Sequence, residues 1–164
     1  MNPQCPAPEV HALGEVVAAF GNLEFFLETT LWQLLGQDGK PNMTAKAFTA
    51  QMSFGARVKA LSSGVRIKHP SLPEEQLDML IKALSRAEEE RNALAHSAWQ
   101  YQGGVGTLMR IKASGKQKGM YHSTHHMPLE KINAIRDEIL SVANELAEFT
   151  IEHLQGGKAQ QSAG

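Results

Sequence analysis

The sequence predicts an all-α fold: an antiparallel helical bundle of three long helices plus one or two shorter ones, with a small β-hairpin before the last helix. The main support is that apolar residues recur every three or four positions over several long stretches, which is the pattern of a helix with one buried face. Glycine and proline cluster between these stretches, where helices are expected to end and begin. With 42% hydrophobic and 20% charged residues, the composition is that of a folded globular protein.

A chain of 164 residues is expected to form one domain with a substantial core. We expect a loose lead-in at residues 1–8, a helical domain at residues 9–155 and a flexible polar tail at residues 156–164. The single cysteine, Cys5, excludes an internal disulfide and fits a reducing compartment. Because we find neither a signal-peptide pattern nor an apolar stretch as long as a membrane span needs, the expected location is the cytoplasm, without membrane contact.

The first long helix is predicted over Glu9–Leu35. Its seam steps by three and four residues and comprises Val10, Leu13, Val17, Phe20, Glu24, Leu27, Leu31 and Leu34. One member of this otherwise apolar seam, Glu24, is a carboxylate. A row of small residues runs beside the seam, at Gly14, Ala18 and Gly21. Because each internal glycine costs about 1 kcal/mol relative to alanine, we expect a close-packed neighbour, either another helix of the fold or a second subunit.

Two shorter helices are predicted at residues 44–51 and 53–68, followed by a long helix at residues 73–98. The seam of that long helix consists of Leu77, Leu80, Leu84, Ala87, Arg91, Leu94 and Ala98. Arg91 therefore occupies a core-facing position, as Glu24 does in the first helix. Since a lone buried charge is very costly unless it is paired and hydrogen-bonded, we predict that Glu24 and Arg91 contact each other.

The pattern then changes to that of short strands. Residues 99–102, 108–112 and 120–122 favour extended structure, and glycines between them mark turns. This segment predicts a small excursion of two or three antiparallel strands. Pro128 then begins the last helix, in which apolar residues again step by three and four as far as Phe149.

One short motif, from Arg91 to His96, combines residue types that suit phosphate chemistry. Asn92 and His96 are four residues apart and share one face of a helix. Arg91 and His96 are five apart, about 140° around the helix axis, so they point to adjoining faces. A site that uses both must lie at an edge between faces, or be completed by a second copy of the helix.

This combination of elements resembles the HEPN superfamily, whose members are small all-α bundles with an arginine, four to six residues, and then a histidine. The present sequence has four intervening residues, with Asn92 in the polar place that often follows the arginine. The motif also lies at the end of the penultimate long helix, before the strand-like excursion, as it does in that superfamily. The resemblance covers roughly residues 9–154 by order of elements, although only the six-residue motif is specific.

The resemblance implies a dimeric, metal-independent RNA endonuclease in which the ribose 2′-hydroxyl attacks the adjacent phosphate, leaving a 2′,3′-cyclic phosphate and a 5′-hydroxyl. His96 would act as general base or acid, and Arg91 would donate hydrogen bonds to the charged phosphorane. Asn92 would orient His96 or contact the phosphate. Glu24 would hold Arg91 through the contact predicted above. No cofactor or metal is implied, and a toxin or defence role with a protein antitoxin or other regulator is the expected setting.

Two other interpretations remain open. The chain would be a catalytically inactive HEPN-like dimer that binds a nucleotide, nucleic acid or protein, or a plain helical scaffold. In the scaffold, Glu24 and Arg91 merely satisfy each other, and His96 is an ordinary C-terminal histidine favoured by the helix dipole. A toxin branch of the superfamily has a tyrosine two places after the histidine, where this chain has Ala98, so that branch and its control by modification are disfavoured.

Because the net charge is only −1, RNA must be bound by a local basic patch. We predict that patch in the strand-like segment, at Arg110, Lys112, Lys116 and Lys118. The alternative is a solvated edge strand whose charges prevent aggregation. A histidine cluster follows, at His122, His125 and His126. It is open to binding zinc or nickel, but without a cysteine or carboxylate to complete a ligand set we favour a polar loop.

Overall fold

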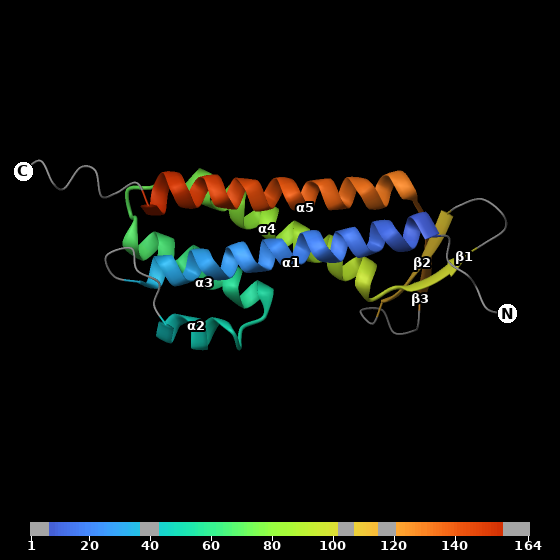
Figure 1. Ribbon diagram of the computed structural model, residues 1–164, viewed down its shortest axis with the longest axis horizontal. Helices are drawn as coiled ribbons and strands as arrows, with labels where there is room; N and C mark the ends of the chain where they lie inside the picture. The colour runs from blue at the N-terminus through green and yellow to red at the C-terminus, as the bar shows by residue number, and fades with distance from the viewer. Residues whose placement is uncertain (1–6, 37–42, 102–106, 115–120, 156–164) are drawn as a thin grey trace, which may run out of the picture.

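The computed structural model describes residues 7–36, 43–101, 107–114 and 121–155. Most of the described chain is helical, as predicted, and Figure 1 shows the helices side by side with a small sheet at one end. In chain order the elements are α1 (Ala7–Leu35), α2 (Met43–Thr49), α3 (Phe54–Lys68), α4 (Glu74–Ala95), β1 (Ala98–Tyr101), β2 (Thr107–Ser114), β3 (Tyr121–Pro128), α5 (Leu129–Phe149) and the π-helical turn η1 (Thr150–Gln155).

Two helix boundaries differ from the predicted ones. Helix α1 begins at Ala7, so the predicted lead-in loses its last two residues to the helix. Its second residue is Pro8, and proline fits a first helical turn because the missing N–H has no partner there. Helix α4 ends at Ala95, and Ala98 already belongs to β1. The apolar side chain of Ala98 fits either pattern, so helical spacing alone placed the end too late.

Helix direction also differs from a fully antiparallel arrangement. In Figure 1, α1 and α5 run the same way, while α4 runs against both. Helix α3 runs in the same direction as α1, so the chain reaches the start of α4 at the end of the molecule where α1 also ends. Helix α1 packs against α5, α3, α2 and α4, and it therefore supplies the largest share of the core.

The buried face of α1 is rotated relative to the predicted seam. Val10 and Val17 are 53% and 62% exposed, whereas Ala12, Val16 and Leu23 are buried. The other buried apolar residues of α1 are Ala19, Phe20, Leu27, Leu31 and Leu34. Because apolar residues cover a wide arc of this helix, their spacing indicates a helix without deciding which edge of the arc faces the core. In α4 the predicted apolar positions from Leu77 to Leu94 are all buried.

Helix α1 is also apolar enough for its length to satisfy the criteria for a membrane span. Residues Pro8–Leu35 pass this test, with 33% of the most apolar window buried, contrary to the expectation that no stretch would. The core helix of a soluble protein passes the same test, so the finding by itself assigns no membrane contact.

The three strands form an antiparallel sheet in the order β1-β2-β3. In its register Trp99 pairs with Arg110, and Arg110 pairs in turn with His125. The sheet adjoins the end of α4 and the start of α5 (Figure 1), and buried Met127 of β3 joins the helical core. The sheet therefore continues directly from the helix that carries the Arg91–His96 motif.

Helix α2 is held to the rest of the fold by a polar network around the buried Thr49 hydroxyl. The indole N–H of Trp32 donates to that hydroxyl over 2.7 Å, and the hydroxyl donates to Glu28 over 3.1 Å. The guanidinium of Arg57 in α3 donates to the Thr49 carbonyl over 3.1 Å. A buried polar network of this kind is stable only when its members are hydrogen-bonded, so it fixes α2 in one position.

Candidate functional site

The Arg91–His96 motif forms the last turn of α4 and its C-terminal cap. His96 is the cap residue, and its backbone N–H donates to the carbonyl of Asn92 over 3.0 Å. The side chain of His96 is exposed, while those of Arg91 and Asn92 are half-buried. The two residues therefore differ in environment: the histidine is open to solvent, and the arginine lies against the core.

Arg91 packs on an aromatic ring of α1. Its guanidinium carbon lies 4.2 Å from the ring centroid of Phe20, a cation–π distance. Its Nε atom is buried and donates no hydrogen bond. The guanidinium is thus supported on one face, and its buried Nε is an unsatisfied donor whose burial costs stability.

The predicted contact between Glu24 and Arg91 is wrong. In the part of the chain that the structure describes, no hydrogen bond or ion pair joins the two residues. The reason is the rotation of α1: Phe20, one turn before Glu24, faces the guanidinium. The aromatic ring of Phe20 thus contacts Arg91 where the sequence predicted a carboxylate, and no described carboxylate forms an ion pair with Arg91.

A small pocket of about 150 Å³ opens beside Arg91, between α1 and the end of α4. Its described lining residues are Leu13, Val16, Val17, Arg91, Leu94, Ala95 and Trp99. Among those side chains only Arg91 and Trp99 carry polar atoms, and the Trp99 indole N–H already donates to the Leu94 carbonyl over 3.0 Å. The pocket therefore combines apolar walls with one positively charged group.

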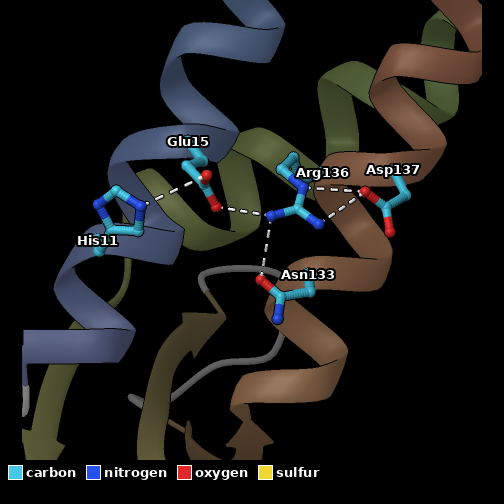
Figure 2. Close-up of polar contacts among 5 residues, drawn as sticks. All are labelled: His11, Glu15, Asn133, Arg136 and Asp137. Atoms are coloured by element: carbon cyan, nitrogen blue, oxygen red, sulfur yellow. Dashed lines mark hydrogen bonds and ion pairs between the residues drawn. The ribbon is translucent and has the colours of Figure 1, made fainter.

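Arg136 shows how a neutralised arginine of this fold is bound (Figure 2). It donates to Glu15 of α1 over 2.6 Å and to its neighbour Asp137 over 2.9 Å, and Glu15 also pairs with His11. Asn133 accepts a further, longer bond from it over 3.4 Å. The hydrogen bonds to Asp137 and then Glu15 raise the pKa of the Arg136 guanidinium above its ordinary value. Among the described residues, Arg91 has no such carboxylate, so its charge is not neutralised in this way.

The predicted basic patch falls only partly within the described residues. Arg110 and Lys112 lie on β2, and Lys116 and Lys118 lie outside the described residues. Because Arg110 is directly opposite Trp99 in the sheet, position 110 shares the sheet face of Trp99. Position 112 lies on that same face, two residues further along. The register thus brings these two positions toward the pocket end of α4.

The histidine cluster lies on a strand rather than in the predicted loop. His122, His125 and His126 all belong to β3, where neighbouring residues point to opposite faces. Of the three side chains, only that of His126 is among those that the structure describes, and it is exposed. No cluster of three or more metal-binding side chains occurs in the portion of the chain that the structure describes.

Two contributors to the site were not assigned from the sequence. Phe20 was taken as an ordinary core residue, and Val17 as a member of the buried seam. The signal that points to Phe20 is its place one turn before Glu24, which makes it equally able to face Arg91. Comparisons with protein-family models, with curated proteins and with solved structures found no match.

Proposed function

We propose that this chain is a HEPN-like, metal-independent RNA endonuclease that acts as a homodimer through Arg91, Asn92 and His96. The observation that carries the proposal is the Arg91 guanidinium, which rests on Phe20 and has no carboxylate partner among the described residues. It lies five residues from an exposed histidine. A fixed cation beside an accessible acid–base group is the minimum that phosphodiester transfer requires.

In the proposed reaction the 2′-hydroxyl of RNA attacks the adjacent phosphorus. One imidazole removes the hydroxyl proton while Arg91 donates hydrogen bonds to the phosphorane oxygens. The bond to the 5′ oxygen then breaks, and a protonated imidazole supplies the proton that this leaving group needs. The products are a 2′,3′-cyclic phosphate and a 5′-hydroxyl. Two imidazoles are available if the second protomer contributes its own His96, and Asn92 would hold one of them in place.

The outer face of α1 supports association of two copies. Val10, Val17 and Phe25 are 53%, 62% and 59% exposed, and they lie on one side of the helix, which Glu24 borders. A side chain added at Gly14 or Gly21 on this side would meet nothing within 4 Å, so the helix backbone is open to close approach. Val17 also lines the pocket beside Arg91, so a second copy packed on this side would lie next to the site.

The sheet supports RNA binding beside the pocket. In the sheet register, positions 110 and 112 lie on the face of Trp99, and cationic residue types near an aromatic residue suit single-stranded RNA. With a net charge of only −1, such local charge would dominate the attraction. The affinity should therefore fall steeply with salt. We place the enzyme in the cytoplasm and in a toxin or defence system with a protein regulator.

An inactive HEPN-like binding dimer is the second candidate, and one observation favours it. Among the described residues, no side chain hydrogen-bonds the His96 imidazole to fix its orientation, whereas catalytic histidines are usually oriented by a partner. In that case the Arg91 pocket would bind a nucleotide or nucleic acid without cleaving it. The plain scaffold loses its main argument, because Glu24 does not satisfy Arg91.

The deciding experiment is RNA cleavage by the purified protein in excess chelator, compared with His96→Ala and Arg91→Met. We expect cleavage with cyclic phosphate ends, and a loss of at least a hundredfold in each variant. His11→Ala is the matched control, since His11 is an exposed histidine that pairs only with Glu15. Equal cleavage by wild type and His96→Ala would assign the activity to a contaminant, and RNA binding without cleavage would favour the inactive dimer.

A further inference from the structure

We propose that the pocket beside Arg91 binds one nucleobase of the RNA, and that it accepts purines and pyrimidines with little selection. This inference rests on the proposed function, because it assigns a substrate subsite to the same site. The subsite would hold the base next to the phosphate that Arg91 contacts. Three features of the pocket support it: its volume, the chemistry of its walls, and the position of the Arg91 guanidinium.

The volume suits a single ring system. At about 150 Å³ the pocket is well below the roughly 300–1,000 Å³ of sites that enclose a drug-sized molecule. An apolar cavity of about this volume in another protein holds one benzene ring. A base that enters edge-first, with its sugar and phosphate outside, matches this size, whereas a whole nucleotide does not.

The walls suit a flat apolar surface and do not read base edges. Leu13, Val17, Leu94 and Ala95 offer methyl groups, and Trp99 adds an aromatic ring. Stacking on an aromatic ring tolerates every base, because every base has a π face. Selection among bases requires free donors and acceptors, but the Trp99 N–H is already bound to the Leu94 carbonyl. The subsite should therefore recognise that a base is present rather than which base it is.

The position of Arg91 explains why the ligand should carry a negative charge. Its guanidinium covers Phe20 with one face, and Arg91 is the one charged residue among the described residues that line the pocket. A phosphate attached to the sugar of the bound base would accept from the guanidinium while the base fills the apolar walls. An aromatic residue of a protein partner with a nearby carboxylate is the rival occupant, but it gives no role to the exposed His96.

The test places a larger side chain in the pocket by substituting a residue that is not part of the core. Ala95 is exposed and lines the pocket, so Ala95→Leu should occupy it without disturbing the fold. Ala134→Leu, at an exposed position of α5, is the matched control. The probe is a labelled, non-cleavable 2′-O-methyl RNA octamer, whose affinity is measured by fluorescence anisotropy. The affinity of this octamer is compared with that of octamers that carry one abasic nucleotide, placed at each position in turn. It is also compared with that of octamers in which a purine replaces a pyrimidine or the reverse.

For the wild type and the Ala134→Leu control, we expect one abasic position to weaken binding about tenfold, in line with the cost of losing one stacked base. Exchanging purine for pyrimidine there should change the affinity less than threefold. Ala95→Leu should bind the normal octamer about tenfold more weakly and should show no further loss with the abasic one. With cleavable RNA, we expect the abasic substitution and Ala95→Leu each to raise KM by a similar factor, with kcat little changed.

Three results would overturn the proposal. One is equal affinity of Ala95→Leu and Ala134→Leu for the normal octamer. Another is a preference of more than tenfold for one base at the sensitive position. The third is displacement of the RNA by a short peptide that ends in phenylalanine, with no abasic effect, which would assign the pocket to a protein partner. Because binding is measured on RNA that cannot be cleaved, absence of ribonuclease activity would refute the proposed enzyme while leaving this test intact.

Discussion

Replacing Arg91 by methionine should make the protein more stable while removing the group that we propose to bind the phosphate. The substitution keeps an unbranched side chain of similar length against Phe20 and removes the guanidinium, whose Nε is buried without an acceptor. No ion pair is lost, because Arg91 has no carboxylate partner among the described residues. The sign of the stability change therefore separates a binding arginine from a structural one.

The expected gain is worked from the contacts. Relieving a buried, unsatisfied donor is worth about 1–3 kcal/mol. Loss of the cation–π contact costs roughly 0.5–1 kcal/mol, part of which a sulfur–aromatic contact of the methionine restores. The net effect is a stabilisation of about 1 kcal/mol, which is about 2–4 °C in Tm for a domain of this size. Had Glu24 held Arg91 in a buried pair, the same substitution would cost about 3–5 kcal/mol.

Urea denaturation of the wild type and Arg91→Met, followed by far-ultraviolet circular dichroism at one salt concentration, measures the difference directly. Arg136→Met is the matched control: the Arg136 side chain is 26% exposed and bonded to Glu15 and Asp137, so we expect a small loss of stability there rather than a gain. A loss of 2 kcal/mol or more in Arg91→Met would refute the reasoning, because it would mean that the guanidinium has a structural partner.

Further variants test the packing and the pH response. Gly64→Ala should lower the free energy of unfolding by about 1–3 kcal/mol, less the helix-propensity gain, because its Cβ would lie 2.7 Å from the Leu34 side chain. Gly21→Ala, whose Cβ would meet nothing within 4 Å, should raise it by about 1 kcal/mol. Urea denaturation measures both. Thr49→Val should lose about 1–3 kcal/mol by unpairing the network that holds α2, measured as a lower Tm. Burial, and then the electrostatic effect of the neighbouring Lys68 and His153, lower the pKa of His69 below its ordinary 6.5. The unfolded chain therefore binds this proton more readily, so stability should fall as pH drops below about 6.5, and His69→Gln should flatten that part of the pH profile.

The helical character of the chain was predictable because it depends on local patterns. Apolar spacing located α1, α3, α4 and α5, and the breakers between them gave boundaries within a few residues. The rotation of α1 was not predictable. Val10 and Val17 are as apolar as Val16, and only the placement of the neighbouring helices decides that the first two face solvent. A single sequence carries no information on that placement.

The same rotation accounts for the error at the site. The reasoning that a buried arginine needs compensation was sound, but it assumed that the compensation must be a carboxylate. An aromatic face can also support a guanidinium, at a lower energy and without neutralising its charge. Residues Phe20 and Glu24 are four apart and lie on one face of α1, so spacing alone does not decide which of the two faces Arg91. Sequence spacing identified the cation correctly and its partner incorrectly.

That exchange bears directly on function. An arginine neutralised by a carboxylate, as Arg136 is by Glu15 and Asp137, gains little from a further anion. Arg91 is held in place by Phe20 and the packing of α4, yet it keeps its charge and an unused donor. The fold thus accepts a destabilising group near a helix end that also presents an exposed histidine. Such a cost is typical of binding and catalytic sites, where the missing partner is the ligand. If Arg91→Met is both more stable and unable to bind RNA, those two results together identify the missing acceptor of Arg91 as a phosphate.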